Sequence, residues 1–346
     1  MPDPDSRFRV AVAGATGAVG EVLLELLAER SFPVGELSAL ASERSVGETV
    51  RAGDRSVRVQ SLGDFDFAGV DFAFFSAGGA VSAEHAPRAA RAGATVIDNT
   101  STFRLDPDVP LVVPEVNGGA LDDWRRGSPA GGIIANPNCS TIQMLVAIAP
   151  IHREFGVARI NVATYQAVSG AGRRAMEELG TQTADKLGFR EPRVSALSAP
   201  IAFNVIPRID EVEDSGFTRE ELKMHFESRR ILGSETLGVN ATAVRVPVFY
   251  GHGEAIHLET ERPFELERVR ELLAAAPGVE LVDTRDGPMP LTHASGRDPV
   301  CVGRLRRDPT HARGLDLWVV ADNVRKGAAL NAIQIAERLA GAADGR

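Results

Sequence analysis

The sequence predicts an α/β protein of two domains: a doubly wound, Rossmann-type N-terminal domain followed by an α+β domain with a mixed sheet. A chain of 346 residues is too long for one ordinary core. Its first part alternates short, nearly continuous apolar runs with helical segments, the pattern of a parallel sheet buried on both faces. Its later strands alternate apolar and polar side chains, and fewer helices separate them, which favours an antiparallel or mixed sheet.

The first domain opens with a strand, a glycine turn and a helix. RVAVAGA (9–15) predicts a buried strand, and the leucines of EVLLELLAER (21–30) recur at helical spacing. Further apolar runs predict strands of the same parallel sheet, and a segment of helical composition that ends in glycine lies between the last two. These strands are expected at 36–42, 71–77 and 94–100, and this helix at 81–93.

The second domain begins after the sequence ANPNCST (135–141). The segment 219–232 predicts an amphipathic helix. A last helix at 324–341 is expected to pack back on the first domain, so the nucleotide-binding domain comprises 1–135 completed by 324–341, and the second domain comprises 136–323. Strands of the second domain are expected at 158–168, 241–250, 255–261 and 298–307.

Composition excludes several classes of protein. The formal net charge of −9 disfavours a nucleic-acid partner. Two cysteines provide no disulfide framework of the secreted kind. The start, MPDPDSRFRVAVAG, lacks the basic and apolar regions of a signal peptide, and no window approaches the roughly 20 apolar residues of a membrane span. We therefore expect a cytoplasmic protein with no membrane partner.

The glycine turn GATGAVG (14–20) predicts a dinucleotide site. Its backbone N–H groups and the following helix dipole favour a pyrophosphate, although the spacing is GxxGxxG and not GxGxxG. An NAD site would carry an acidic residue after the second strand, whereas here Ser42, Arg44 and Ser45 could hold a 2′-phosphate. This favours NADP, provided that the side chain of Glu43 points away.

Cys139 is the candidate nucleophile. It follows a proline-containing turn and precedes an apolar helix, and a thiol at a helix N-terminus is placed to ionise and attack an acyl group. The alternative is a small buried residue, which explains Cys301 in DPVCVG better. The Tyr-x-x-x-Lys pair of short-chain dehydrogenases is absent, because Ser169 and Glu254 stand four residues after the two tyrosines.

An acid or base must accompany the thiol. We favour His252, which follows an expected strand and is flanked by Gly251 and Gly253, so that its ring should be accessible. His257 and His293 remain alternatives. No CxxC or HExxH spacing occurs, so no metal site is expected.

Cations in two segments are candidate anion holders. Arg104 follows a strand end, where open α/β sheets bind ligands, and Arg245 interrupts an apolar strand and should face a cleft or a carboxylate. The chain has only three lysines, of which Lys223 and Lys326 fall in predicted functional segments. For Lys223 alone, a solvated helix face is the simpler explanation.

Taken together, these motifs resemble those of aspartate-semialdehyde dehydrogenases over nearly the whole chain. Two departures are Gly253, where the family often has serine, and DNTSTFR in place of DNSSAFR. We expect the first to loosen the turn that carries His252. The resemblance rests on GATGAVG, LASERSVG, DNTSTFRLDPDVPLVVPEVN, IIANPNCSTIQM, TYQAVSGAGR, FNVIPRID, EELKM, RVPVFYGHGEA and DNVRKGAALNAIQIAE.

The resemblance implies a role for each matching position. Cys139 would be the acyl nucleophile, His252 the general acid/base, and Gln166 would orient the substrate. The substrate α-carboxylate would bind Arg245 and its amino group Glu220. Phosphate would bind Arg104, Asn138 and Lys223, and NADP(H) would bind Gly14, Thr16, Gly17, Ala18, Val19, Ser42, Arg44, Ser45, Gly170 and Asn323.

The implied reaction is the reversible, NADPH-dependent reductive dephosphorylation of L-4-aspartyl phosphate to aspartate semialdehyde, in the synthesis of lysine, threonine, methionine and diaminopimelate. The resemblance also implies a homodimer or a dimer of dimers, built through the second, catalytic and dimerisation domain. One alternative is an N-acetyl-γ-glutamyl-phosphate reductase, but its typical cysteine context, GCYPT, is absent here. A glyceraldehyde-3-phosphate-type enzyme would contain SCTTN, which is also absent. The remaining alternatives are a Cys/His acyl hydrolase and a non-catalytic NADP-binding regulator.

Overall fold

The computed structural model of the chain describes residues 7–127 and 131–341. The first six residues, on which part of the signal-peptide argument rests, lie outside these ranges. The chain divides into two compact units, which are described separately. Unit 1 comprises Met1–Asn138 with Ala328–Arg346, and unit 2 comprises Cys139–Gly327.

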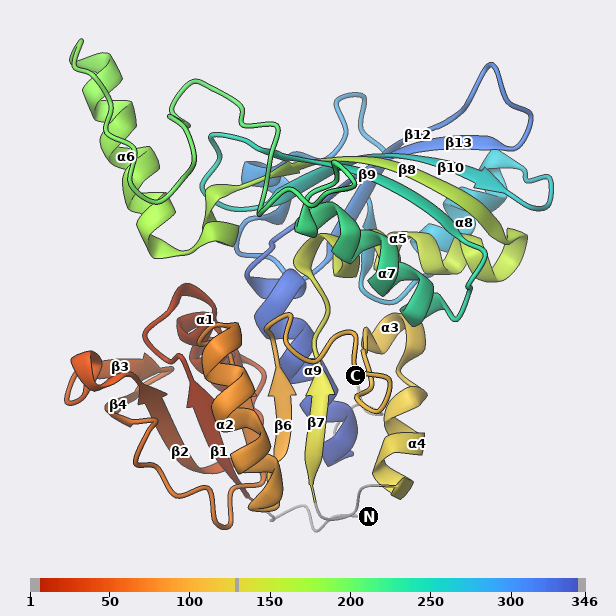
Figure 1. Ribbon diagram of the computed structural model, residues 1–346. Helices are drawn as coiled ribbons and strands as arrows, with labels where there is room; N and C mark the ends of the chain where they lie inside the picture. Colours follow the sequence, from red (N-terminus) through yellow and green to blue (C-terminus); the bar gives the residue numbers. More distant parts are fainter. Residues whose placement is uncertain (1–6, 128–130, 342–346) are drawn as a thin grey trace. The chain divides into compact units, whose positions relative to one another are not determined.

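Within the described ranges, unit 1 contains a sheet of seven strands in the order β3-β4-β2-β1-β5-β6-β7 (Figure 1). The strands from β4 through β7 pair in parallel, and β3 pairs antiparallel with β4 at one edge. The strands are β1 (Phe8–Ala13), β2 (Val34–Ala41), β3 (Thr49–Ala52), β4 (Arg55–Ser61), β5 (Phe72–Phe75), β6 (Thr95–Asp98) and β7 (Gly132–Ala135).

Helices cover both faces of this sheet. Val10 and Val12 of β1 belong to the apolar core that α1 and α9 complete, whereas Ala11 and Ala13 belong to the core beneath α2. Successive side chains of a strand point to opposite faces, and here both faces are buried, so the strand is apolar at every position from Val10 to Ala13. The doubly wound prediction is confirmed. The helices of unit 1 are α1 (Ala18–Glu29), α2 (Gly79–Arg91), α3 (Pro114–Asn117), α4 (Ala120–Gly127) and α9 (Leu330–Ala340), with the 3₁₀ turn η1 (Glu43–Ser45).

Unit 2 contains, in the residues that the structure describes, a sheet of six strands in the order β11-β12-β13-β10-β8-β9. Strand β8 is parallel to β9 and β11 to β12, while the remaining pairs are antiparallel, so the mixed sheet is confirmed. The strands are β8 (Val157–Gln166), β9 (Gly238–Arg245), β10 (His252–Thr260), β11 (Val279–Leu281), β12 (Val300–Arg307) and β13 (Gly314–Ala321).

The sheet of unit 2 is covered mainly on one face, and η3 covers a smaller part of the other around Cys301 and Val320. Along β8, Val162 and Thr164 are buried, whereas the intervening Ala163 is half-buried and Tyr165 is 41% exposed. Helices α5 and α7 pack on the buried side, called the inner face here, and this arrangement explains the alternation in the sequence. The helical elements are α5 (Cys139–Phe155), α6 (Arg173–Leu187), α7 (Arg219–Leu232) and α8 (Leu266–Ala274), with the short turns η2 (Val168–Ala171), η3 (Pro290–Ala294) and η4 (Arg325–Ala329).

Most element boundaries differ from the predictions by a few residues, and the reason can be seen in two cases. The strand expected over 241–250 ends at Arg245, because Pro247 has no N–H to continue a strand ladder. The helix expected over 324–341 begins with the π-helical turn η4 before α9. No helix in the described part of the chain has the length and apolar character needed to cross a membrane.

Candidate active site

Cys139 is the first residue of the 17-residue helix α5 and remains partly exposed. The interpretation as a fully buried small residue therefore does not apply to it. Gly327 lies against it so closely that a Cβ at position 327 would be 2.8 Å from the Cβ of Cys139. Because the free N–H groups at a helix start favour an anion, the sulfur occupies a suitable place for a thiolate.

His252 follows strand β9, as predicted, but it is the first residue of β10 and is fully buried, so the prediction of an accessible ring was wrong. Its Nδ1 accepts a hydrogen bond of 3.0 Å from the backbone N–H of Ala167. Burial, and then the nearby charge of Arg245, lower the pKa of this imidazole well below its usual value. The neutral ring therefore carries its proton on Nε2, which finds no hydrogen-bond partner among the described residues.

Arg245 and His252 lie together beside Gly170. A Cβ on Gly170 would be 3.1 Å from Nη1 of Arg245 and 3.3 Å from Nε2 of His252. Burial lowers the pKa of Arg245, while the charges of Glu220 and Cys139 act in the opposite direction. These mutual effects place the sulfur, the imidazole, the guanidinium and the Glu220 carboxylate in one electrostatic cluster within unit 2.

Gln166 connects this cluster to α5 and α7. Its Nε2 donates to Oγ of Ser140 at 2.9 Å and to Oε1 of Glu220 at 3.2 Å. Glu220 lies in the first turn of α7, whose start is fixed by a capping box in which Thr218 and Glu221 bond each other's backbone N–H. The end of β8, the start of α5 and the start of α7 thus meet at Gln166.

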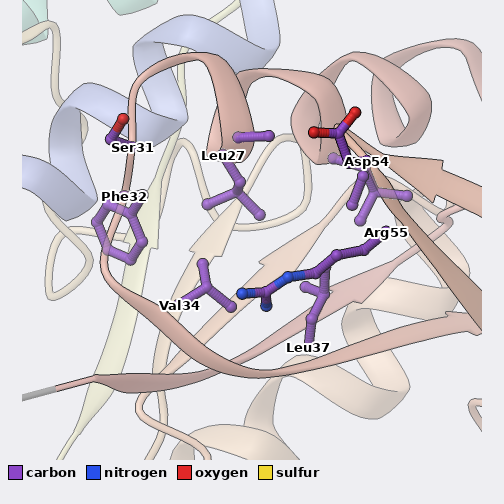
Figure 2. A pocket seen from close by; sticks show the side chains of 10 residues that line it. Leu27, Ser31, Phe32, Val34, Leu37, Asp54 and Arg55 are labelled. Carbon is purple, nitrogen blue, oxygen red and sulfur yellow. The ribbon is translucent and has the colours of Figure 1, made fainter.

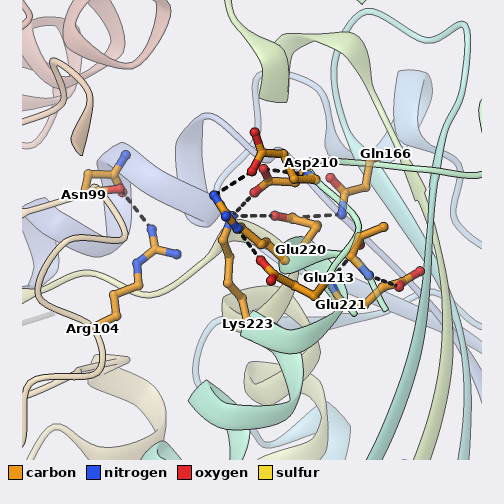
Figure 3. Close-up of polar contacts among 11 residues, drawn as sticks. Asn99, Arg104, Gln166, Asp210, Glu213, Glu220, Glu221 and Lys223 are labelled. Carbon is orange, nitrogen blue, oxygen red and sulfur yellow. Dashed lines mark hydrogen bonds and ion pairs between the residues drawn. The ribbon is translucent and has the colours of Figure 1, made fainter. Parts of the chain in front are cut away.

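Lys223 is paired with carboxylates and is not a solvated cation. Its Nζ lies 2.8 Å from Oδ2 of Asp210 and 3.1 Å from Oε2 of Glu220 (Figure 3). Burial alone would lower the pKa of Lys223, but the two carboxylates raise it overall. Asp210 was not predicted as a site residue, since an acidic residue in a loop has no periodicity that distinguishes it.

Asn323 and Ser169 fix the connection before His252. Oδ1 of Asn323 accepts the N–H of Gly251 at 3.0 Å and the hydroxyl of Ser169 at 3.0 Å. Nδ2 of Asn323 donates to the same hydroxyl oxygen at 2.9 Å. Both side chains are buried, so the structure gives Asn323 a role in holding the backbone beside His252.

In unit 1 the glycine turn has the geometry of an anion cradle. Gly14 has φ +86°, and a Cβ there would lie 2.5 Å from the carbonyl oxygen of Ser76. Gly17 is the N-cap of α1 and provides no side-chain cap, so the first turn of the helix keeps backbone N–H groups for a ligand. Thr16, Ala18 and Val19 are half-buried around this turn. These residues fit a dinucleotide pyrophosphate.

Glu43 lies in the η1 turn after β2, among the residues expected to hold a 2′-phosphate. The hydroxyl of Ser61, at the end of β4, donates to Oε1 of Glu43. Ser42 and Arg44 are exposed, and Ser45 is half-buried. The Glu43 carboxylate therefore has a hydrogen-bond partner at the end of β4.

Arg104 and Asn138, the expected phosphate ligands outside α7, belong to unit 1. Arg104 is 7% exposed, and its Nη2 donates to the carbonyl oxygen of Asn99 at 3.0 Å (Figure 3). Asn138 is buried and ends the first segment of unit 1. Burial raises the pKa of the neighbouring Asp98, although hydrogen bonds from Ser82 and Thr100 oppose the effect.

Comparison with known proteins identifies the family. Residues 9–124 match the family described as "Semialdehyde dehydrogenase, NAD binding domain", and residues 148–326 match "Semialdehyde dehydrogenase, dimerisation domain". "Aspartate-semialdehyde dehydrogenase 2" of Vibrio cholerae is 55% identical over 96% of this chain and 98% of its own. The chain belongs to the aspartate-semialdehyde dehydrogenase family. The resemblance seen in the sequence motifs is confirmed.

Solved structures of aspartate-semialdehyde dehydrogenases share this fold. The crystal structure of aspartate semialdehyde dehydrogenase II from V. cholerae, complexed with ASA, is 53% identical and has a TM-score of 0.94 over 99% of this chain and 100% of that one. A more distant member, from Candida albicans and solved with NADP, is 26% identical with a TM-score of 0.76 over 97% and 99% of the two chains. The two-domain α/β architecture is therefore that of the family.

Several features lie apart from the candidate catalytic and substrate-binding residues. Cys301 is buried, and burial raises the pKa of its thiol to about 11. His257 bonds Asp316 on the less covered face of the sheet, called the outer face here, and not on the face of His252. In the described ranges, no group of His, Cys, Asp or Glu is arranged to hold a metal ion.

Unit 1 also contains a cavity of about 280 Å³. Leu27, Phe32, Val34 and Arg55 are among the residues that line it (Figure 2). It lies where β2 begins, whereas the glycine turn follows the end of the parallel strand β1. None of the predicted cofactor or substrate residues lines this cavity.

Proposed function

We propose that the chain catalyses the reversible, NADPH-dependent reductive dephosphorylation of L-4-aspartyl phosphate to L-aspartate 4-semialdehyde, through a thioester on Cys139. This step belongs to the synthesis of lysine, threonine, methionine and diaminopimelate. One observation supports the chemistry most directly. A partly exposed thiol begins α5 in the same cluster as a buried arginine and an imidazole whose Nε2 has no protein partner in the described residues.

The substrate would bind through charge complementarity. Nη1 of Arg245 donates to the carbonyl oxygen of Ala167 at 2.7 Å, and the rest of its five-donor fork can engage the substrate α-carboxylate. Glu220, already near Gln166 and Lys223, would receive the α-amino group. Lys223, Arg104 and Asn138 would receive the phosphate. Binding then requires Lys223 to exchange part of its interaction with Asp210 for the phosphate.

In the reaction, the Cys139 thiolate attacks the acyl carbon, and the bond from that carbon to the phosphate oxygen breaks, so that phosphate leaves with the electron pair. NADPH, when bound, supplies the hydride that reduces the thioester carbon. The Nε2–H of His252 would hydrogen-bond the carbonyl oxygen while it carries negative charge, and His252 would act as the general acid/base. Cleavage of the carbon–sulfur bond then releases the aldehyde and restores the thiolate.

The cofactor residues favour NADP over NAD. Ser42, Arg44 and Ser45 offer a cation and hydroxyls for the 2′-phosphate, and the contact with Ser61 holds the Glu43 carboxylate aside. The C. albicans enzyme, solved with NADP, is consistent with this choice. Gly14, Thr16, Gly17, Ala18 and Val19 would bind the pyrophosphate, while Gly170 and Asn323 would border the nicotinamide carboxamide.

The assembly and location follow from the family. The match of residues 148–326 to a dimerisation domain supports a homodimer built through unit 2, and a dimer of dimers is the larger form that we propose. Cytoplasmic location is part of the same proposal.

The test is a comparison of initial rates. NADP⁺ reduction with aspartate semialdehyde and phosphate should be measurable and should exceed the rates with NAD⁺ or with N-acetylglutamate semialdehyde. Cys139→Ala should reduce the rate by a factor on the order of 10⁴ or more, since the covalent route is lost, while NADPH binding by fluorescence remains. Cys301→Ala is the matched control and should retain turnover. Full turnover by Cys139→Ala would rule out the thioester mechanism, and faster use of N-acetylglutamate semialdehyde would favour the alternative reductase.

A further inference from the structure

A buried acid with no part in the proposed chemistry lies two residues after His252. Glu254 belongs to β10 and is 0% exposed. Since side chains two apart on a strand point to the same face, Glu254 shares the inner face of the sheet with His252. Neither of its carboxyl oxygens has a hydrogen bond of good geometry with any described residue.

The strands on either side of Glu254 place no cation beside it. The residues opposite it are Thr164 of β8 and Val319 of β13, neither of which titrates in the working range. His252 precedes it by two residues on β10, and Cys139 begins α5, which packs on β10. Burial raises the pKa of Glu254 well above its usual value, opposed only partly by the Gln143 amide. Burial without a paired charge therefore favours the neutral form of this carboxyl.

Gln143 is the group that faces this acid. It is 0% exposed, and its two amide atoms likewise lack a well-formed hydrogen bond to any described residue. Gln143 stands four residues after Cys139 on α5, which places both side chains on the same side of the helix. Helix α5 packs directly on β10. A carboxylic acid has an O–H donor and a carbonyl acceptor, and a carboxamide has two N–H donors and a carbonyl acceptor, so a small adjustment would let the two groups form a pair of hydrogen bonds with each other.

We propose that Glu254 is a positioning residue whose un-ionised carboxyl pairs with the Gln143 amide and fixes α5 on β10, one helical turn from Cys139 and two residues from His252. The pair then sets the separation of the sulfur and the imidazole. This inference rests on the proposed roles of Cys139 and His252 and adds a residue that touches neither substrate nor cofactor.

The test compares a variant that keeps the paired groups with one that removes them. Glu254→Gln retains a donor and an acceptor without a charge, whereas Glu254→Leu has neither. The leucine variant should lose at least tenfold in kcat with KM unchanged within about twofold, and the glutamine variant should restore kcat to within about twofold. The pH profile of Cys139 alkylation by iodoacetamide, followed by mass spectrometry, should shift in the leucine variant and not in the glutamine variant.

Ser228→Ala is the matched control. Ser228 lies on α7, is fully buried, and has a hydroxyl without a partner among the described residues, yet it belongs to neither α5 nor β10. Its removal should leave both the kcat and the alkylation profile unchanged. A shift in this control would show that any buried polar change alters the site, and the assignment to Glu254 would fail.

The remaining outcomes are decisive in one direction or the other. Equal losses in Glu254→Gln and Glu254→Leu would show that a carboxylate charge is required, and wild-type kinetics in Glu254→Leu would show that the pair is dispensable; either overturns the proposal. Should Glu254→Leu not fold, Gln143→Leu replaces it, and a tenfold loss of kcat supports the proposal while unchanged kcat contradicts it. Failure of the thioester mechanism itself is recognised separately, by turnover in Cys139→Ala.

Discussion

In unit 1 the central strands of the parallel sheet are buried on both faces, whereas the sheet of unit 2 is covered mainly on its inner face. Strand β1 is apolar from Val10 to Ala13, and the candidate ligand groups of unit 1 all come after strands end, as in the glycine turn and at Arg104. In unit 2 the inner face of the sheet itself contains polar side chains. They are Thr164, Gln166, Arg245, His252 and Glu254, each buried.

The difference shows how coverage of a sheet decides where its chemistry can be. A sheet between two apolar layers has no strand position at which a charge is tolerated, so its ligands bind at strand ends. A sheet covered mainly on one face can place polar residues at the inner positions where a helix begins, because side chains of α5 and α7 provide partners, as Ser140 and Glu220 do for Gln166. Such a site is fixed by the strands themselves.

The strongest test of this comparison is a substitution of Arg245, the charged residue buried at the end of β9. Arg245→Lys should lower kcat/KM for aspartate semialdehyde by about 10- to 100-fold, mainly through KM, because an ammonium cannot reproduce the two-pronged contact of guanidinium with a carboxylate. Steady-state kinetics measures the change. The exposed Arg159 of β8 provides the control, since Arg159→Lys should leave the kinetics unaltered. If Arg245→Lys keeps wild-type values, the carboxylate is bound elsewhere.

A smaller effect, on stability, is expected on the outer face of the same sheet, where the ring of Trp318 lies against Gly253. Gly253 lies within β10 and not in a turn, and a Cβ there would be 2.6 Å from the ring of Trp318. The glycine that stands here in place of the family's frequent serine therefore leaves room for the ring of Trp318. Gly253→Ser should lower the free energy of unfolding by about 1–3 kcal/mol through overpacking, as measured by urea denaturation.

Ala255, two residues after Gly253 on the same strand, provides the control for this prediction. Ala255 is exposed on the same strand, and Ala255→Ser should change stability by less than about 0.5 kcal/mol. Combining Gly253→Ser with Trp318→Val should recover part of the loss that the serine causes. Simple additivity of the two substitutions would contradict the assigned contact.

The smallest effect is expected at a strand end of unit 1. Ser61→Ala removes the hydroxyl that holds Glu43, so the carboxylate can approach the 2′-phosphate, and the preference for NADP⁺ over NAD⁺ should fall about two- to fivefold. The ratio of kcat/KM for the two cofactors measures it. Ser56→Ala on the same strand is the control. In a Glu43→Gln background the Ser61 substitution should have no effect; a persistent change there would show that Ser61 acts by another route.

Much of the fold could be predicted because its strands follow the two burial patterns described above. The edge strand β3 and its neighbour β4 were not predicted, since the four-residue TVRA and the mostly exposed RSVRVQS bury too few side chains to give a strong pattern. Gly53, with φ +60° between them, was the available turn signal. The end of β9 was placed too late because the apolar VPVFY continues the pattern after Pro247 has ended the pairing.

The individual site residues were easier to name than their surroundings. Cys139 could be recognised because a turn precedes it and a helix follows, and Arg245 because it interrupts an apolar strand. Asp210 and Ser61 could not, since their role comes from contacts across 13 and 18 residues of sequence that no local pattern reports. The burial of His252 was missed because flanking glycines suggested an open loop, whereas here Gly253 makes room for Trp318.

Gly327 shows how far the demands of a reactive group reach along a chain. The residue contributes no functional group, yet any side chain there would press on the carbon that bears the sulfur. In a library of random variants selected for growth without added lysine, threonine, methionine and diaminopimelate, position 327 should therefore tolerate substitution almost as poorly as position 139 itself. Sensitivity to mutation would then identify Gly327, which leaves space for the nucleophile, as clearly as it identifies Cys139.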